Sequence, residues 1–251
     1  MTETSLETRA LSRNFGALRA VREIDFKLGV GARHALIGPN GAGKTTFINL
    51  LTGALAPTQG RVLLAGRDIT DKAQAERVKL GLARTFQINR LFRGLSVLEN
   101  VCISVAERIG AAPSMVCPVG WRTDVIDESL HILEALKLLD HAGYRVSELP
   151  YGRQRLVELA ITIGLRPEVL LLDEPAAGVP SAESHIILDA IERLPEHIAV
   201  LIIEHDMEVV FRFAKRVTVM VSGAVFAEGT PREIEASPEV RAVYLGQAAR
   251  G

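Results

Sequence analysis

One stretch of the chain has the composition of a phosphate-binding loop. It fits the pattern G-x-x-x-x-G-K-[ST] and runs between a short apolar segment, residues 34–37, and a helical pattern that begins at Thr46. Glycines there let backbone N–H groups turn toward a polyphosphate, and the following helix N-terminus adds partial positive charge. We expect phosphate contacts from the whole loop: Gly38, Pro39, Asn40, Gly41, Ala42, Gly43, Lys44, Thr45 and Thr46.

Within this loop two side chains have their own chemistry. The Lys44 ammonium would reach the β- and γ-phosphates, and the Thr45 hydroxyl would ligate Mg²⁺. The alternative is an ordinary glycine-rich turn, which the strand-and-helix context disfavours.

A second candidate site follows the apolar run 169–172, which ends in Asp173 and Glu174. Ligands bind at the carboxyl ends of parallel strands, so Asp173 would hold Mg²⁺ and Glu174 would polarise an attacking water. The alternative is that the two carboxylates belong to a solvated acidic turn after the strand. The phosphate loop in the same chain disfavours this alternative.

The elements that must position these residues alternate along the chain. Strand patterns cover residues 7–30 and 61–69, with partial alternation at Val21, Ile24, Phe26 and Leu28, and apolar runs follow at 34–37, 169–172, 198–203 and 217–221. Such runs separated by helices predict an α/β fold with a mostly parallel, doubly covered sheet.

The middle of the chain differs. Residues 96–165 carry helical periodicity: a capping box at Ser96, a loop over 110–120, a helix over about 124–139 and another after Gly152. An all-helical insert therefore interrupts the core.

Composition excludes several classes of protein. With 251 residues the chain suits one large domain or two small ones, and 29 basic against 30 acidic residues leave no basic footprint for nucleic acid. Cys102 and Cys117 have no metal-ligand spacing. No apolar run approaches the ~20 residues that span a bilayer, and the N-terminus is no signal peptide. We expect a soluble, cytoplasmic chain that reaches a membrane only through a partner.

Residues 149–155, Leu-Pro-Tyr-Gly-Arg-Gln-Arg, open a helix, and here the chain resembles the ATP-binding-cassette (ABC) ATPases. The family signature is L-S-G-G-Q, so Leu149 and Gly152 match it, while Pro150 and Tyr151 replace a serine and a glycine. The resemblance implies that these four residues contact the γ-phosphate of an ATP held by another subunit.

The other motifs of the family occur in order. Phe15 matches the aromatic that stacks on adenine, although a core phenylalanine is an even alternative. Gln87 matches the glutamine at the junction of core and insert, which implies roles in catalysis and as a metal ligand. His205 matches the histidine that contacts the γ-phosphate. Pro180 stands where the family has an aspartate, which weakens any role of that carboxylate between subunits.

The resemblance implies a P-loop NTPase (ABC ATPase) core with a mostly parallel sheet, an N-terminal antiparallel β subdomain and an inserted helical subdomain. The whole chain, 1–251, would be one ABC ATPase domain, with its nucleotide-binding core in 1–87 and 167–251 and the helical subdomain with the signature in 88–166. Glu174, His205 and Gln87 would be catalytic, Thr45, Gln87 and Asp173 would hold Mg²⁺, and ATP would be the ligand.

Four segments narrow the resemblance to the branched-chain (hydrophobic) amino-acid importers: 81–88, 149–155, 173–180 and the tail with Glu228-Gly-Thr-Pro and 243–246. The implied partners are permeases in the inner membrane, a second ABC ATPase or a second copy in a head-to-tail dimer, and indirectly a solute-binding protein. Residues after Gln87 would dock a permease helix through Ile88, Leu91 and Phe92, unless these pack within the insert.

Other functions remain open at this stage. A soluble ABC ATPase of DNA repair or translation would carry long coiled-coil insertions or two cassettes, and this chain has neither. An importer for another solute, such as urea or another amide, is equally compatible with the ATPase motifs. A catalytically decayed nucleotide-binding module is disfavoured by the intact lysine, carboxylates and histidine, and a small-molecule kinase requires neither the signature nor His205.

Overall fold

The computed structural model describes residues 4–85, 91–111, 122–175, 177–179 and 181–248. The chain divides into two compact units. The first, the core unit, comprises residues 1–82, 168–174 and 195–251, and the second, the helical unit, comprises 83–167 and 175–194. The helical unit thus contains residues 175–194, which lie outside the sequence-predicted insert. The domain boundaries predicted from the sequence differ from the bounds of these two units and remain a prediction.

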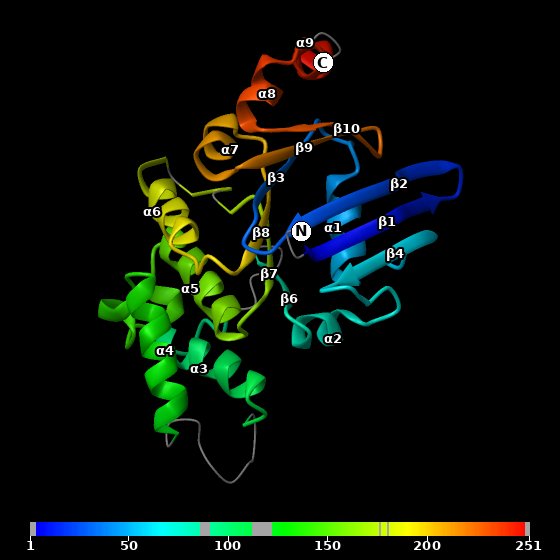
Figure 1. The fold of residues 1–251 in the computed structure, drawn as a ribbon. Helices are drawn as coiled ribbons and strands as arrows, with labels where there is room; N and C mark the ends of the chain where they lie inside the picture. The colour runs from blue at the N-terminus through cyan, green and yellow to red at the C-terminus, as the bar shows by residue number, and fades with distance from the viewer. Residues whose placement is uncertain (1–3, 86–90, 112–121, 176, 180, 249–251) are drawn as a thin grey trace. The chain divides into compact units, whose positions relative to one another are not determined.

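The core unit contains an antiparallel sheet of four strands with the order β2-β1-β4-β5 (Figure 1). Its strands are β1 (Thr4–Phe15), β2 (Leu18–Gly29), β4 (Gln59–Leu64) and β5 (Arg67–Asp68). The region 7–30, predicted to form strands, contains two of them, because Gly16 takes a left-handed φ of 57° and Phe15 pairs with Leu18 across the turn.

A bulge explains the uneven alternation in β2. Glu23 has a φ of 47°, and the pairing register shifts on either side of it. Val21 and Ile24, three residues apart, consequently both face the core, and regular alternation then holds through Phe26 and Leu28.

The larger sheet has the order β10-β9-β3-β8-β7-β6. Pairing is parallel between β9 and β3, between β3 and β8 and between β8 and β7, and antiparallel between β10 and β9. The strands are β3 (Arg33–Ile37), β6 (Leu82–Thr85), β7 (Val169–Asp173), β8 (Ala199–Ile203), β9 (Arg216–Val221) and β10 (Ala224–Gly229). The four apolar runs that the sequence predicted as buried strands correspond to β3, β7, β8 and β9.

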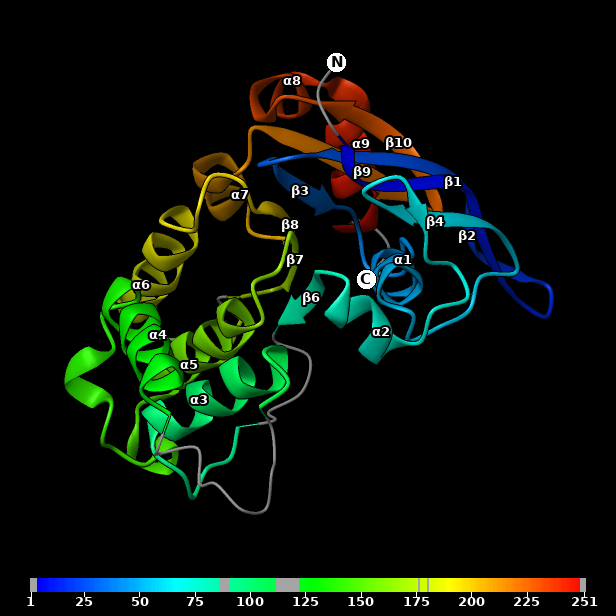
Figure 2. The same cartoon turned by 60° about the horizontal axis from the view of Figure 1, so that its bottom comes forward.

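Helix α1 (Lys44–Thr52) packs in the core between the two sheets (Figure 2). Its buried face places Phe47, Ile48 and Leu51 in one cluster with residues of both sheets, such as Leu11 and Leu201. The other helices of the core unit are α2 (Gln74–Lys79), α7 (Met207–Phe213), α8 (Pro231–Ala236) and α9 (Pro238–Ala248).

The helical unit contains α3 (Val97–Arg108), α4 (Thr123–Ala135), α5 (Tyr151–Gly164) and α6 (Ser181–Glu192), with 3₁₀ turns at Leu139–His141 and Val146–Glu148. The first three helices pack on one another, and α6 packs on α5. The predicted capping box at Ser96 is present, since its side chain accepts from the Glu99 N–H while Glu99 accepts from the Ser96 N–H.

The predicted helix over 124–139 is shorter in the structure. It ends at Ala135 because Lys137 takes a left-handed φ of 56°, which reverses the chain and buries both Leu136 and Leu138. The predicted loop over 110–120 falls largely outside the described residues, as do Gln87, Ile88, Cys117 and Pro180.

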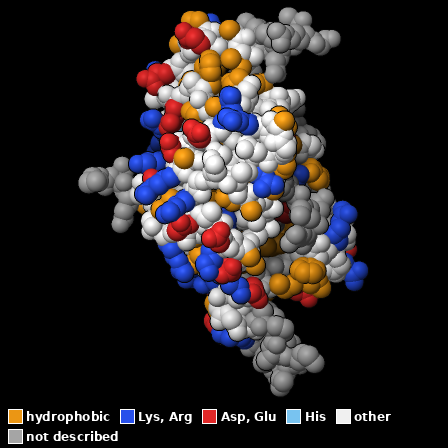
Figure 3. All heavy atoms as spheres, turned by 90° about the vertical axis from the view of Figure 1, so that its right-hand side faces the viewer, with side chains coloured by type: hydrophobic (Ala, Val, Ile, Leu, Met, Phe, Trp, Pro, Cys, Tyr) orange, Lys and Arg blue, Asp and Glu red, His pale blue; other side chains and the backbone are white. Residues whose placement is uncertain are grey.

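Acidic and basic side chains are interspersed on the face shown in Figure 3. This distribution agrees with the near-neutral composition. Among the described residues, no helix has both the length and the apolar composition needed to cross a membrane.

Candidate functional site

The phosphate loop has a backbone that only glycine adopts without strain. Gly43, directly before α1, has a φ of 96°, and a Cβ there would lie 2.4 Å from the Ala20 carbonyl oxygen. A Cβ at Gly38 would lie 2.2 Å from the Met220 carbonyl oxygen. The loop therefore packs against β2 on one side and β9 on another, and its shape is set by close backbone contacts.

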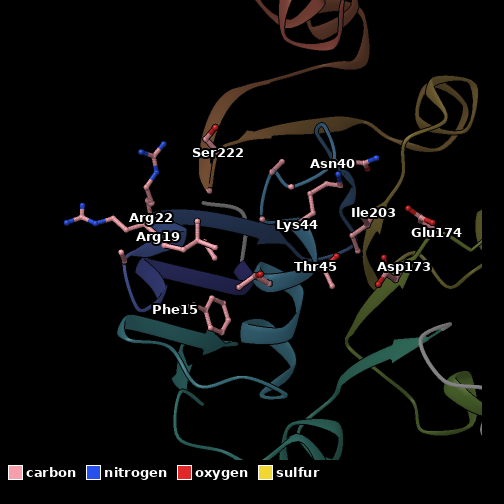
Figure 4. A pocket seen from close by; sticks show the side chains of 18 residues that line it. Phe15, Arg19, Arg22, Asn40, Lys44, Thr45, Asp173, Glu174, Ile203 and Ser222 are labelled. Carbon is pink, nitrogen blue, oxygen red and sulfur yellow. The ribbon is translucent and has the colours of Figure 1, made fainter. Parts of the chain in front are cut away.

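The loop borders a cavity of about 780 Å³ that lies wholly within the core unit (Figure 4). Figure 4 shows Lys44 and Thr45 in the middle of the site, with Phe15 on one side and the two strand-end carboxylates on the other. The volume is typical of a small-molecule site. Sequence-predicted site residues that line it are Phe15, Asn40, Gly41, Ala42, Gly43, Lys44, Thr45, Thr46, Asp173 and Glu174.

Lys44 is the cation of the loop. Its Nζ donates to the carbonyl oxygens of Gly38 and Pro39, the latter at 3.1 Å. Burial lowers the pKa of Lys44, and the nearby carboxylates of Glu174 and Asp173 act in the opposite direction. The two carboxylates favour the charged form of Lys44, and the half-buried ammonium can then attract a polyphosphate.

Asp173 and Glu174 follow each other but occupy different backbone conformations. Asp173 is the last residue of β7 and pairs with Ile203 of β8. Glu174 has a left-handed φ of 45°, and its N–H donates to the Ile203 carbonyl oxygen at 3.0 Å. The reversal sends the two side chains in different directions, so one carboxylate can bind a metal while the other acts on water.

His205 lies beside Glu174. Its Nδ1 is 3.4 Å from Glu174 Oε1, and the imidazole is 69% exposed. The ring is held at the turn between β8 and α7, where the Asp206 side chain caps the helix by accepting from the Glu208 N–H. An imidazole with this exposure is not a core histidine.

Phe15 ends β1 and is 46% exposed, which does not fit a core phenylalanine. The Arg13 guanidinium lies 4.8 Å from the centre of its ring. Phe15 therefore places an exposed aromatic ring at the edge of the cavity, and base stacking requires such a ring.

The comparisons with known proteins agree with this geometry. The sequence model of the family described as "ABC transporter" matches residues 21–177. The high-affinity branched-chain amino acid transport ATP-binding protein LivG of Salmonella typhimurium is 37% identical over 99% of this chain and 100% of its own. The chain belongs to the ABC transporter family. It is an ATP-binding cassette and an ATPase, and the predicted fold class is confirmed.

Further relatives extend the match across lineages and to solved structures. A probable branched-chain amino acid transport ATP-binding protein LivG of Archaeoglobus fulgidus is 36% identical, over 96% of this chain and 95% of its own. A crystal structure of the ADP conformation of an ATP-binding cassette of an ABC transporter has a TM-score of 0.86 and 30% identity, and the match covers 98% of this chain and 100% of that one. A model described as "Branched-chain amino acid ATP-binding cassette transporter" matches residues 224–250.

The predicted signature, residues 149–152, lies in the helical unit at the start of α5. Pro150 stands just before the helix, Leu149 and Gly152 are buried, and Tyr151 is 37% exposed. The Arg155 guanidinium lies 4.9 Å from the centre of the Tyr151 ring. Near the predicted permease-docking segment, Leu91 is buried and Phe92 is exposed.

Several cavity-lining residues were not predicted from the sequence. They are Ala17, Leu18, Arg19, Ala20, Arg22, Ile203, Ser222 and Gly223. The turn between β9 and β10 is bound on two sides, because the Gly223 N–H donates to the Ala42 carbonyl at 2.9 Å and its carbonyl accepts from the Arg22 N–H at 2.7 Å. A Ser-Gly pair after an apolar strand was the available signal, since it marks a turn at the strand's carboxyl end.

Proposed function

We propose that the cassette is the ATP-hydrolysing subunit of a membrane importer for branched-chain or other hydrophobic amino acids. The observation that carries the ATPase role is that Lys44, Thr45, Asp173 and Glu174 line the same cavity. The proposed solute rests on the named relatives and on the match at residues 224–250.

In this proposal the phosphate loop and Phe15 hold ATP. The adenine stacks on the exposed ring of Phe15, the backbone N–H groups of residues 40–46 surround the phosphates, and the Lys44 ammonium binds the β- and γ-phosphates. The close backbone packing at Gly38 and Gly43 keeps these N–H groups in place before the nucleotide arrives.

The donor set of the cavity fits Mg²⁺. Thr45 offers a hydroxyl and Asp173 a carboxylate, and Gln87 would add an amide oxygen. A small number of hard oxygen donors suits Mg²⁺, because this ion keeps several of its waters and also binds oxygens of the substrate phosphates. Bound there, Mg²⁺ would neutralise charge on the phosphates.

The chain's own residues then carry the reaction. Glu174 orients and polarises the water that attacks the γ-phosphorus in line with the leaving oxygen. His205, 3.4 Å from that carboxylate, donates to the γ-phosphate, and Gln87 contributes to catalysis and to the metal site. Lys44 stabilises the charge that develops on the transferred group.

The remaining contacts come from other subunits. Leu149, Pro150, Tyr151 and Gly152 would face the γ-phosphate bound to a second ABC ATPase, or to a second copy of this chain, in a head-to-tail dimer. A cytoplasmic helix of an integral-membrane permease would bind at the segment that ends in Phe92, with a solute-binding protein acting on the permease from the far side. The cassette would thus work at the cytoplasmic face of the inner membrane.

Purification of the tagged chain from detergent-solubilised native membranes tests this assignment. We expect two permeases and a second, related ATPase to co-purify, and binding assays on the accompanying solute-binding protein to identify the solute. Recovery without any permease would overturn the transport role and leave the ATPase activity standing.

A further inference from the structure

We propose that Glu204 is a positioning residue for His205, through which it acts on ATP hydrolysis. Glu204 follows β8 directly and is 3% exposed, whereas its neighbour His205 is 69% exposed. The burial of this carboxylate needs an explanation, because an acidic side chain is rarely buried unless it makes hydrogen bonds or ion pairs.

The contacts of Glu204 define that task. Its Oε2 accepts from the His205 N–H at 3.2 Å and lies 3.9 Å from His205 Nδ1. The same Nδ1 lies 3.4 Å from Glu174 Oε1. The imidazole is therefore bordered by two carboxylates, one buried behind it and one at the cavity.

The backbone of Glu204 links this arrangement to the phosphate loop. Its N–H donates to the Leu36 carbonyl at 3.4 Å, and Leu36 lies in β3 two residues before Gly38. Glu204 is thus held by the strand that leads into the loop, and it holds the backbone from which the His205 ring projects.

Burial acts against the ionised form of Glu204. Desolvation raises the pKa of its carboxyl group, and the N–H groups of His205 and Asp206 oppose that change. An apolar side chain would fill this space without the cost of desolvating a carboxylate. The role of the Glu204 carboxylate is therefore its hydrogen bond to the His205 N–H, more than packing.

This role of Glu204 rests on the proposed role of His205, and it predicts different effects on kcat and on KM for ATP. ATP affinity depends on Phe15 and the phosphate loop, whereas the hydrogen bonds of Glu204 join it to His205 and to the Leu36 carbonyl. Loss of the Glu204 carboxylate therefore displaces His205 from the γ-phosphate and lowers kcat, while KM for ATP stays nearly constant.

The test compares three variants of the full chain in steady-state ATP hydrolysis. Glu204→Ala removes the acceptor, and we expect kcat to fall roughly tenfold or more with KM within about twofold. Glu204→Gln keeps an acceptor oxygen for the His205 N–H, and we expect kcat within about threefold of the unchanged chain. Asp206→Ala is the matched control, because it removes the cap of α7 at the same turn without touching the Glu204 contact.

The outcomes separate positioning from general loosening of the turn. Equal losses of kcat in Glu204→Ala and Asp206→Ala would overturn the proposal, as would a Glu204→Gln variant as slow as the alanine. Absence of hydrolysis in the unchanged chain would count against the proposed function instead.

A second readout does not depend on activity. In the full chain with ¹⁵N-labelled histidine, we expect the ring nitrogen signals of His205 to move in Glu204→Ala and to stay in place in Asp206→Ala. Unmoved signals in Glu204→Ala would overturn the proposal even for an enzyme too slow to assay.

Discussion

The phosphate loop of the core unit and the signature of the helical unit are both glycine-containing segments that lead into a helix, but they are built differently. The loop is bound by backbone contacts to β2 and to the β9–β10 turn, and Cβ atoms at Gly38 or Gly43 would collide with carbonyl oxygens. The signature instead relies on side chains, with the Arg155 guanidinium over Tyr151 and Glu158 paired to Arg155 at 2.9 Å.

This difference suggests a division of labour. A site fixed by backbone contacts can bind its nucleotide alone, whereas a helix start fixed by side chains can be changed without loss of that binding. We therefore expect changes in the core unit to alter ATP binding and hydrolysis in the isolated chain, and changes at the signature to leave ATP binding intact.

The largest effect is expected for Glu174→Gln. The amide cannot accept a proton from water, so hydrolysis should fall roughly 100- to 10,000-fold, the range of general-base catalysis. ATP binding by calorimetry should be retained, which gives a trapped ATP-bound dimer. Glu235→Gln, a substitution of an exposed carboxylate on α8, is the control. Undiminished hydrolysis in Glu174→Gln would remove the proposed base.

Acid is expected to weaken the core unit more than the helical unit. His34 is buried against Phe26 and Thr218, and burial lowers its pKa from 6.5 to about 4. A depressed folded-state pKa means that its stabilisation is present above pH 6.5 and is lost as the pH falls toward 4, by roughly 3 kcal/mol. Burial raises the pKa of Glu158 in the helical unit and of Glu204 in the core unit, which favours folding of either unit at low pH, so His34 is the group that makes the core unit more sensitive to acid.

Urea unfolding of the chain and of His34→Gln between pH 7 and pH 4 measures this difference. The unchanged chain should lose stability more steeply than the variant. If the two plots of unfolding free energy against pH ran parallel, His34 would not change its protonation on unfolding. The expected difference in acid sensitivity between the two units would then be wrong.

Lys44→Ala should weaken ATP binding. A hydrogen bond to a charged group contributes about 1.5–3 kcal/mol, so affinity should fall roughly 10- to 100-fold. Lys27→Ala, which removes a lysine largely exposed on β2, should leave the calorimetric affinity unchanged. Unaltered affinity in Lys44→Ala would mean that the backbone alone binds the phosphates.

The smallest effect is expected at the signature. Tyr151→Ala removes the cation–π contact with Arg155 and should lower the free energy of unfolding by roughly 0.5–1 kcal/mol. ATP affinity of the isolated chain should stay within about twofold. Tyr144→Ala, a change at a more exposed tyrosine of the same unit, serves as the control. A clear loss of ATP affinity in Tyr151→Ala would break the proposed division between the units.

The parts of this molecule that the sequence predicted are those with local signals. Buried parallel strands are continuous apolar runs, so β3, β7, β8 and β9 could be recognised. The phosphate loop and the two carboxylates after β7 follow spacing rules that hold within a few residues. The approach of Glu174 to His205 could be expected only because both follow strands that end at the same edge.

Other features depend on register and could not be predicted. Gly223 reaches Ala42 only because β9 lies beside β3 with Thr218 opposite Leu36, and no local pattern sets that pairing. The early end of α4 depends on one left-handed residue, Lys137, within helical periodicity that continues past it. The bulge at Glu23 likewise has no glycine to mark it.

The position of β3 has a consequence for the growing chain. Its two neighbours are β8 and β9, so Leu36 pairs with Ile203 and Thr218, far later in the sequence. At about 5–20 residues per second, translation needs roughly 10 to 40 s to supply those strands after β3 has been made. A nascent chain thus carries the complete phosphate-loop sequence long before the sheet beside it exists. ATP can therefore act as a folding ligand only after β8 and β9 have been made.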